Sequence, residues 1–395
     1  MKRIDRRLAL GLAAAAWTAV FLCGATVRVL ADCASYGLPF TDLGAETAFC
    51  SAIAEAYYTG ITSGTSATTF EPGANVTREQ AAAFATRTLD AGLARGSRRA
   101  ALGQWWTTTP RWDLGVGLTA VGSLPGALTS DGADIWVADP KDGIVSRVRA
   151  SDGRLLERWT GADQAAGILA AMGRIFVTGF DTGNLYMIDP SKPAGEVETV
   201  AHIDNAELTS LVFDGAKIWV LSSMRVWVVE IGTWTVTPIP SADFLTGISF
   251  DGVNVWVASS VAGYLERYST SGEPLQSVQV GSSPRNPVFD GTNLWVPNLG
   301  DDSITVVNAR QGTVVRTILS DGGNSLKTPL SLAFDGQRIA VTNVGIDSAS
   351  RFVSLFKATD LSFIGKFAAS DVGDVCNDGV NFWFSFPEKS AIGRF

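Results

Sequence analysis

The feature that most constrains this chain is a short segment that recurs seven times in its last two-thirds. Each copy places a small turn, usually Asp-Gly, before an apolar run that in most copies contains an aromatic residue. The copies read DGADIWV, AMGRIFV, DGAKIWV, DGVNVWV, DGTNLWV, DGQRIAV and DGVNFWF, starting at Asp131, Ala171, Asp214, Asp251, Asp290, Asp335 and Asp378. Successive starts are 37 to 45 residues apart, and the sixth copy has Ala340 where the others have Trp or Phe. A chain with this period is built from similar units that pack side by side.

The turn chemistry and the apolar segments predict four short antiparallel strands in each unit. The fifth unit has four apolar segments, at 287–289, 294–296, 304–307 and 314–318. Asp290-Gly291 between the first two segments is a strong hairpin signal, because Gly tolerates positive φ. A repeat of about 40 residues with four strands is typical of a β-propeller blade. The sequence therefore predicts a mainly β protein with a seven-bladed β-propeller over residues 118–395.

The ends of the repeat region indicate how the ring closes. The last repeat has three strand segments before the chain ends, and one spare apolar segment, 118–122, precedes the first repeat. Pairing the two would complete the last blade and remove both exposed edges. The aromatic residues of the repeats should fill the seams between blades, where each ring buries about 150–250 Å². These predicted core residues are Trp136, Phe176, Trp219, Trp256, Trp295 and Trp383.

Residues 1–31 have the pattern of a signal peptide. A basic start, MKRIDRR, precedes an uncharged apolar stretch over 8–25, and Ala31 offers a small residue at a cleavage point. The alternative is an uncleaved membrane anchor, because about 18 apolar residues nearly span a bilayer. Without these residues the chain has 26 basic and 38 acidic side chains, since five of the 31 Lys and Arg and one of the 39 Asp and Glu are removed. A net charge of −12 argues against nucleic acid as a partner.

The cysteines fit an exported protein. Cys33 and Cys50 flank a short loop near the start of the mature chain, and in an oxidising compartment they are a candidate disulfide. Cys376 lies in an apolar strand pattern and is expected to be a buried small hydrophobic residue rather than a nucleophile. The Cys and His residues have no spacing typical of a structural zinc site.

Residues 32–106 predict a small all-α module, and 107–117, which contain Pro110, predict a linker. Residues 45–58 are rich in Ala and indicate a first helix. Thr77 and Gln80 have the spacing of a capping box, in which each side chain satisfies the other residue's backbone amide. A second helix should follow from there toward Trp105.

The module carries a series of motifs in a fixed order: Phe40-Thr41-Asp42-Leu43, Gly60-Ile61-Thr62-Ser63-Gly64, Phe70-Glu71-Pro72 and Val76-Thr77-Arg78-Glu79-Gln80-Ala81-Ala82. It resembles an S-layer homology domain over roughly 50 residues. The resemblance implies anchoring to cell-envelope polysaccharide, with Arg78 and Asp42 as the candidate binding residues. A planar guanidinium at a helix start suits an anion.

Two features of the module leave alternatives open. The family commonly builds its sugar site from three copies of the domain, whereas this chain has one, so a homotrimer is a hypothesis. Position 80 is Gln, which changes the motif in detail. The alternative to polysaccharide binding is a spacer or oligomerisation element in which Arg78 forms only a surface ion pair.

The repeats also resemble a known group over residues 118–395. Asp-Gly-Thr-Asn-Leu-Trp-Val-Pro-Asn from residue 290 and Val341-Thr342-Asn343 are similar to the YVTN, NHL and virginiamycin B lyase-like propellers. The lyases of this group use histidine and acidic residues with a metal. This chain has a single histidine, His202, which cannot supply both a base and a metal ligand, so we expect no lyase activity and place His202 in a loop or a seam.

Propeller ligands usually bind where loops converge near the channel, and these loops are acidic here. The residues are Asp139, Asp142, Asp163, Asp181, Asp204, Asp243, Asp301, Asp302, Asp321, Asp371 and Asp374, joined by Arg285, Asn286, Asn298 and Asn343. Asp139, Asp301, Asp302, Arg285 and Asn286 are the candidates for ligand binding. A cation, with Ca²⁺ as the candidate, or a cationic partner would suit this face. The alternative is a face that serves solubility alone.

Together these patterns predict an exported protein of the cell envelope or cell surface. It would act as a binding or scaffold protein, anchored by the S-layer homology-like module and presenting the propeller to a protein or a small ligand. The alternative is a metal-dependent lyase or hydrolase on the acidic face.

Overall fold

The structure is a computed structural model that divides into two units, which are described separately. It describes residues 38–44, 50, 53, 56–57, 62, 64–66, 68–78 and 80–85, and then 117–395 except 205, 242–243, 261–262, 321–325 and 346–350. The predicted signal peptide, Cys33 and nearly all of the predicted linker lie outside the described residues. Within the described ranges, no helix combines the length and hydrophobicity that a membrane span requires.

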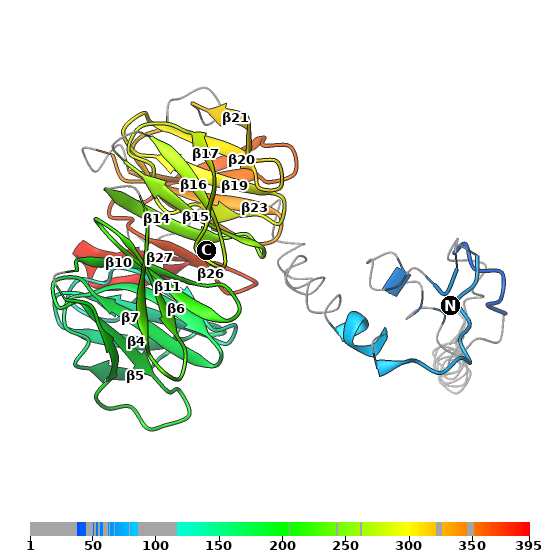
Figure 1. Ribbon diagram of the computed structural model, residues 1–395, viewed down its shortest axis with the longest axis horizontal. Coiled ribbons are helices and arrows are strands. Elements are labelled where there is room, and N and C mark those ends of the chain that lie inside the picture. Colours follow the sequence, from blue (N-terminus) through cyan, green and yellow to red (C-terminus); the bar gives the residue numbers. More distant parts are fainter. Residues whose placement is uncertain are drawn as a thin grey trace, which may run out of the picture. The chain divides into compact units, whose positions relative to one another are not determined.

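The C-terminal unit consists of seven four-stranded antiparallel sheets, as predicted (Figure 1). Blade 1 contains β2 (Leu128–Ser130), β3 (Asp134–Asp139), β4 (Ile144–Arg149) and β5 (Leu155–Thr160). Blade 2 contains β6 (Ala165–Ala171), β7 (Arg174–Gly179), β8 (Asn184–Ile188) and β9 (Glu198–His202). Blade 3 contains β10 (Leu208–Phe213), β11 (Lys217–Ser222), β12 (Val226–Glu230) and β13 (Val236–Ile239). Blade 4 contains β14 (Leu245–Phe250), β15 (Asn254–Ser259), β16 (Tyr264–Ser269) and β17 (Pro274–Gln279).

The remaining three blades follow the same pattern. Blade 5 contains β18 (Val288–Phe289), β19 (Asn293–Asn298), β20 (Ser303–Asn308) and β21 (Thr313–Ile318). Blade 6 contains β22 (Pro329–Phe334), β23 (Arg338–Asn343), β24 (Phe352–Lys357) and β25 (Phe363–Ala368). Blade 7 contains β26 (Val375–Asn377), β27 (Phe382–Phe386), β28 (Ala391–Arg394) and β1 (Leu118–Ala120), with a short 3₁₀ turn (Pro387–Lys389) before β28.

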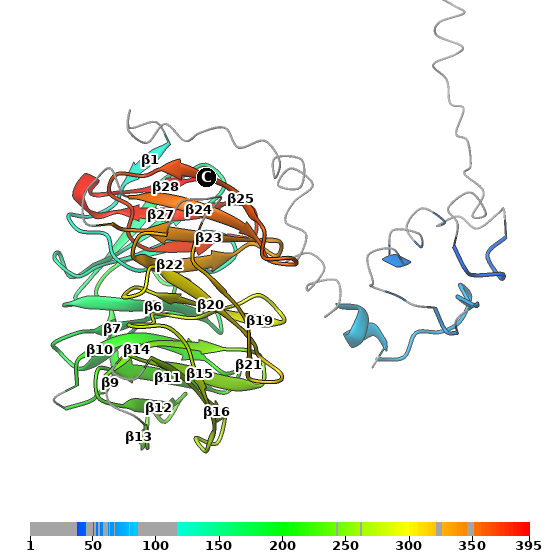
Figure 2. The same ribbon diagram turned by 90° about the horizontal axis from the view of Figure 1, so that it is seen from above.

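The predicted ring closure is confirmed. β1 pairs antiparallel with β28, with Leu118 opposite Gly393 and Ala120 opposite Ala391 (Figure 2). The N-terminal strand thus becomes the outermost strand of the last blade. No blade is left with three strands, because the two ends of the repeat region pair with each other.

In most blades the Asp of the Asp-Gly turn and the aromatic residue of the seam are joined by the same hydrogen bond. In five blades the turn Asp accepts backbone N–H bonds from the residues two and three positions ahead through Oδ1. Its Oδ2 accepts the indole Nε1–H of the Trp five positions ahead, at 2.7 to 2.8 Å. The Gly has φ between +89° and +97°, a region in which other residues are strained. These Asp–Trp pairs join Asp131, Asp214, Asp251, Asp290 and Asp378 to Trp136, Trp219, Trp256, Trp295 and Trp383.

The indole rings lie in the seams, as predicted. Each of the five is 0 or 1% exposed and packs against the next blade around the ring. Trp295 of blade 5, for example, contacts a cluster that contains Ile339 and Val341 of blade 6. Burial of a ring of this size stabilises each seam by about 4–6 kcal/mol as an upper bound, at about 25 cal/mol per Å². The tryptophans are therefore core residues rather than a surface for stacking sugars.

Blades 2 and 6 lack the Asp–Trp hydrogen bond, and neither blade leaves a partner of that bond unpaired. Blade 2 has Ala171 in place of the Asp and Phe176 in place of the Trp, so acceptor and donor are lost together. Blade 6 keeps Asp335 but has Ala340 at the Trp position, and Arg338 Nε donates to Asp335 Oδ2 at 2.7 Å instead. The space left by Ala340 is filled by a cluster that includes Phe382, Phe384 and Phe386 of blade 7.

The N-terminal unit is held by a small aromatic cluster and one carboxylate. Phe40 is 7% exposed and packs edge-on against Tyr57 at 5.2 Å and against Phe70 at 5.5 Å between ring centroids. Residues 50, 53, 56 and 57 are helical, as expected for the first helix. A second stretch is helical at 78 and 80–85, and the rest of the predicted second helix lies outside the described residues.

The capping box is confirmed. The Thr77 backbone N–H donates to Gln80 Oε1 at 2.9 Å, and the Gln80 N–H donates to Thr77 Oγ1 at 3.2 Å. This arrangement satisfies two of the free amides at the helix start and fixes where the helix begins. Arg78 is consequently placed in the first helical turn.

Candidate functional site

The first strands of the seven blades surround a central channel. Each contacts the first strands of both neighbouring blades, so the seven strands form a closed inner ring. The channel contains a cavity of about 570 Å³. Its polar lining includes Arg285, Asn286, Ser331 and Asp374.

One position in each blade determines the chemistry of this channel. It lies four residues before the turn Asp, and in blades 1 to 7 it is Ala127, Gly167, Ser210, Gly247, Asn286, Ser331 and Asp374. Six of these seven residues line the cavity, and Gly247 packs against the Asn286 backbone. Blades 1 to 4 have Ala, Gly, Ser and Gly there, whereas blades 5 to 7 have Asn, Ser and Asp. All three residues of blades 5 to 7 are polar and form a polar arc, while in the other four blades only Ser210 is polar.

Asp374 connects three blades across the polar arc. Its Oδ1 accepts the Ser331 hydroxyl of blade 6 at 2.5 Å, and its Oδ2 accepts the Leu128 N–H of blade 1 at 2.8 Å. Its own N–H donates to Ser385 Oγ at 2.8 Å. Burial raises the pKa of Asp374, and the hydrogen bonds from Ser331 and Leu128 oppose this only in part. The carboxyl group thus lies where the ring closes.

Asn286 spans the seam between blades 4 and 5. Its Oδ1 accepts the Ile248 N–H at 3.1 Å. The adjacent Gly247 is required by this close approach, because a Cβ there would lie 2.5 Å from the Asn286 backbone nitrogen. The Asn286 carboxamide keeps its Nδ2 donors without an acceptor among the described residues. The amide is therefore positioned by one atom and free to donate through the other.

Arg285 is the cation of the channel. Its backbone N–H donates to Pro297 O at 2.9 Å, which fixes the main chain. Its Nε is buried and has no hydrogen-bond partner, and within the described part of the chain its guanidinium forms no ion pair. Next to it, the Thr246 hydroxyl donates to Pro284 O at 2.6 Å.

The acidic loop residues have local structural roles. Asp139 is 2% exposed and accepts backbone N–H bonds from Leu124, Lys141 and Asp142. Asp301 accepts the Ser282 N–H at 2.6 Å, and Asp302 accepts the Thr328 N–H at 2.7 Å. Asn298 and Asn343, in the same register as Asp139, also accept backbone N–H bonds from the incoming loop. Each of these side chains therefore binds the backbone of a segment that connects two blades.

The predicted candidates do not all converge. Arg285 and Asn286 line one cavity, whereas Asp139, Asp301 and Asp302 are not among its lining residues. Nowhere in the described ranges do three or more His, Cys, Asp or Glu residues form a group that could hold a metal ion. Sequence reasoning missed Ser331; it placed Asp374 in a loop near the channel, where it lies, but did not select it among the binding candidates. Aligning the seven repeats on the position four residues before the turn Asp would have identified both.

His202 lies at the outer edge of the ring. It is in β9, the outermost strand of blade 2, rather than in a loop or a seam as expected. Its ring nitrogens contact Asn184 Oδ1 at 2.8 Å and Asp204 Oδ1 at 3.0 Å, and its side chain is 53% exposed. The single histidine of the chain is therefore separated from the channel by the three inner strands of its blade.

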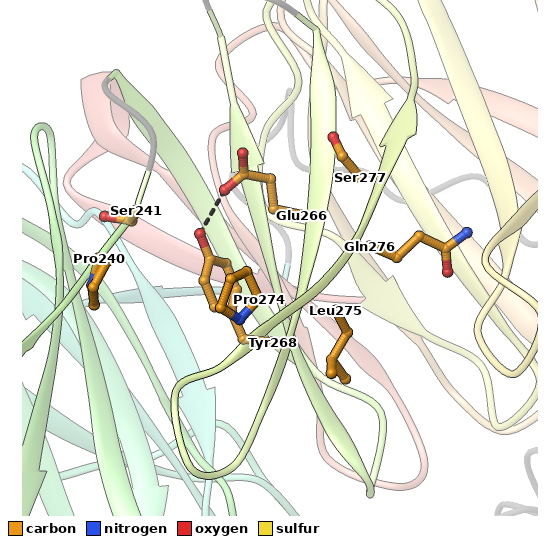
Figure 3. Close-up of a pocket in the computed structure, with 8 residues that line it drawn as sticks. All are labelled: Pro240, Ser241, Glu266, Tyr268, Pro274, Leu275, Gln276 and Ser277. Carbon is orange, nitrogen blue, oxygen red and sulfur yellow. Dashed lines mark hydrogen bonds between the residues drawn. The ribbon is translucent and has the colours of Figure 1, made fainter.

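A second hollow, of about 560 Å³, lies between blades 3 and 4 on the outer side of the ring. Figure 3 shows that Tyr268 and Glu266 occupy it together, and the Tyr268 hydroxyl donates to Glu266 Oε2 at 2.6 Å. Burial raises the pKa of Tyr268, and Glu266 raises it further. Gln276 donates to Gly312 O at 2.8 Å. Because these polar groups already have partners, this hollow is a weaker candidate than the channel.

The residues predicted to bind polysaccharide are placed as follows. Arg78 is exposed in the first turn of the second helix. Asp42 accepts the Phe70 N–H at 2.9 Å and the Glu71 N–H at 2.6 Å, and these bonds lower its pKa. Asp42 therefore joins the first motif to the Phe-Glu-Pro turn and acts as a positioning residue.

Cys50 and Cys376 are described, and Cys376 is only partly buried rather than fully buried as expected. Cys50 is 5% exposed, and because Cys33 lies outside the described residues, the disulfide stays a prediction. Cys376 is a free thiol packed against the cluster around Trp383, and burial raises its pKa well above the usual value. It is therefore a poor nucleophile.

Comparisons with known proteins agree with both units. Residues 39–82 match the S-layer homology domain. The structure is similar to virginiamycin B lyase from Staphylococcus aureus, with 14% identity, a TM-score of 0.58, and coverage of 70% of this chain and 98% of that one. It is also similar to hydrazine synthase from Kuenenia stuttgartiensis, with 15% identity, a TM-score of 0.58, and coverage of 71% and 97%.

A third similar structure is the β-propeller domain of Cps50 (Swd1) from Myceliophteria thermophila, with 11% identity, a TM-score of 0.60, and coverage of 71% of this chain and 98% of that one. No curated protein sequence matches the chain. At these identities the similar structures establish the fold alone. The chain is thus an S-layer homology domain followed by a seven-bladed β-propeller, an arrangement associated with the cell envelope through its first domain.

Proposed function

We propose that this is an exported binding protein of the cell envelope, which its S-layer homology domain anchors to envelope polysaccharide while the propeller binds a further ligand. The observation that carries the proposal is the match over residues 39–82, supported by the confirmed capping box that places Arg78 at a helix start. The acidic net charge and the amino-terminal signal pattern are consistent with this location.

Arg78 is the residue proposed to contact the polysaccharide. Its side chain is exposed in the first turn of the helix, where a negatively charged sugar substituent could reach it. The free amides of the first helical turn lie near it and prefer a negative group. Because both Asp42 oxygens accept backbone amides, Asp42 contributes by shaping the neighbouring turn.

The test is retention of the purified protein on isolated cell-wall fractions. Arg78→Ala should reduce retention about tenfold, the equivalent of one charge-assisted contact worth about 1.5 kcal/mol. Lys192→Ala, which removes an exposed cation of the propeller, is the matched control and should leave retention unchanged. Equal retention of the wild type and Arg78→Ala would contradict the role of Arg78.

The homotrimer is a separate part of the proposal. A single domain per chain can rebuild a three-copy sugar site only if chains associate. Sedimentation of the purified protein should then show a trimer, and a monomer at the concentrations used for wall binding would remove this part. The lyase or hydrolase alternative gains no support, because His202 lies outside the channel and the described residues show no metal-ligand group.

A further inference from the structure

The channel holds a cation whose hydrogen bonds are incomplete. Arg285 lines the cavity, its Nε is buried without a partner, and among the described residues no carboxylate lies within ion-pair distance of it. A buried donor without an acceptor destabilises a folded protein, and a charged one does so more strongly. Arg285 as a whole is only partly buried and lines the cavity, so its terminal guanidinium nitrogens, rather than the covered Nε, are the donors that a ligand in the cavity can reach.

The residue next to Arg285 offers a second donor. Asn286 Oδ1 is held by the Ile248 N–H at 3.1 Å, which leaves the Nδ2 group available to the same cavity. Gly247 provides the space that this arrangement needs. Two consecutive residues therefore present a guanidinium and an amide to one cavity. The corresponding pairs of the other blades contain no cation, and only one of them, Thr209-Ser210, also has two donor side chains; the others are Gly126-Ala127, Ala166-Gly167, Thr246-Gly247, Leu330-Ser331 and Gly373-Asp374.

The charges in the cavity limit the ligand to a single negative charge. A guanidinium is a planar fork that matches a carboxylate through two parallel hydrogen bonds. Asp374 lines the same cavity and bonds to Ser331 and Leu128 rather than to Arg285, and its carboxylate would repel a second negative charge on the ligand. The volume of about 570 Å³ suits a small molecule, since ligand pockets span about 300–1,000 Å³.

We propose that the channel binds a small molecule with one carboxylate, which accepts two hydrogen bonds from Arg285 and one from Asn286 Nδ2. The hydroxyls of Thr209, Ser210 and Thr246 line the same cavity and can contact polar groups on the rest of the ligand. This chemistry is found at the carboxyl end of a short peptide and on an acidic sugar. The proposal does not depend on envelope anchoring, because Arg78 and Arg285 belong to different units.

The experiment measures the preference of the full chain for an acid over its neutral partner by calorimetry. The first pair is N-acetyl-alanyl-alanine and its carboxyl-terminal amide, and the second is glucuronic acid and glucuronamide. At least one acid should bind at least tenfold more tightly than its amide, and the pair that shows the preference identifies the source of the carboxylate. Equal binding within both pairs, or no binding at about 10 mM, the weak end of measurable affinity, would overturn the proposal.

Variants assign the preference to Arg285. Arg285→Gln should reduce the acid-over-amide ratio to near one, and Arg285→Lys, which keeps the charge but loses the fork, should retain only part of it. Arg316→Gln, an exposed arginine on the outer strand β21, is the matched control and should keep the full ratio. If Arg285→Gln fails to fold by circular dichroism, Arg285→Lys and Asn286→Ala carry the test. A full preference in Arg285→Lys and Asn286→Ala would contradict the assigned contacts, as would one in folded Arg285→Gln.

Discussion

The seams and the channel of the propeller are built from the same seven repeats but follow opposite rules. At the seams, five blades use the same Asp–Trp hydrogen bond, and the other two replace donor and acceptor in compatible ways. In the channel, the position four residues before the turn Asp is Ala, Gly, Ser and Gly in blades 1 to 4 and Asn, Ser and Asp in blades 5 to 7. The positions of the turn Asp and the seam Trp are repeated and stabilise the fold, whereas the position four residues before the turn Asp varies and sets the polarity of the channel.

This difference has an energetic basis. Every blade must pack against the next blade in the same way, so the same Asp and Trp pair can fill most of the seams. A channel position is surrounded by side chains from other blades, so its residue can vary without changing the seams. A channel residue that is unsatisfied or strained lowers the stability of the fold, and the seams must offset this loss. Such a residue therefore indicates a binding role.

The largest effect should come from breaking the ring that the seams complete. Deleting residues 118–121 removes β1, whose pairing with β28 completes blade 7. The free energy of unfolding should fall by more than about 5 kcal/mol, beyond the usual range for single substitutions. Urea unfolding monitored by tryptophan fluorescence measures the loss. Deleting 107–110 in the predicted linker is the control, and equal stability of the two deletions would show that closure contributes little.

A single seam substitution tests the shared register directly. Trp295→Ala removes an indole with 0% exposure between blades 5 and 6 and should destabilise the protein by about 3–5 kcal/mol. Val253→Ala, at a side chain that is 70% exposed, should change stability by less than about 0.5 kcal/mol. Urea midpoints for both variants measure the contrast, which would disappear if the indole were not core.

The hydrogen bond of the seam can be separated from its packing by a double-mutant cycle. Trp295→Phe should cost about 1–3 kcal/mol, because it leaves Asp290 Oδ2 without the bond of 2.7 Å from the indole. Asp290→Ala should cost more, because it also removes the acceptor of the Thr292 and Asn293 N–H groups. The double variant imitates the Ala171 and Phe176 pair of blade 2 and should cost about 1 kcal/mol less than the sum of the singles. If the stability costs of the two single substitutions simply add, the two side chains are not coupled by their hydrogen bond. That bond would then not explain why blade 2 lacks both the Asp and the Trp.

The pH response of Asp374 probes the channel register. Burial raises its folded-state pKa above the unfolded value of about 3.9, so the folded state binds the proton more tightly. The stability that this group contributes is therefore complete below about pH 3.9 and is lost as pH rises through the folded pKa. Asp374→Asn cannot titrate, and its amide can accept from Leu128 and donate to Ser331.

The measurement is the melting temperature of wild type and Asp374→Asn from about pH 3 to about pH 8. Wild type should lose stability relative to the variant as pH rises. Asp371, whose pKa is raised by burial, is present in both proteins and cancels in the difference. A difference that stays constant with pH would show that Asp374 does not titrate as its burial implies.

The sequence predicted the features that depend on local chemistry or on repetition. The Asp-Gly turns, the seam tryptophans, the closing strand at Leu118 and the Thr77–Gln80 capping box are all present. Each follows from residue types at fixed spacing, because a turn or a cap involves neighbours in the chain.

The features that the sequence did not predict depend on contacts between distant segments. Asp374 and Leu128 meet only because the ring closes, and they are 246 residues apart in sequence. Asp139 was expected as a ligand at an acidic rim, but it is buried and accepts two backbone N–H bonds from its own loop and one from Leu124, which precedes β2. His202 was expected in a loop or seam, but β9 extends far enough to include it.

The most direct test of the contrast between seam and channel is the melting temperature of Arg285→Gln without ligand, compared with that of Trp295→Phe. Arg285→Gln removes a charge whose Nε is buried without a partner, so its melting temperature should equal or exceed that of wild type, while Trp295→Phe should melt lower. If Arg285→Gln instead loses as much stability as Trp295→Phe, Arg285 is part of the framework, and the channel register does not carry the function assigned to it.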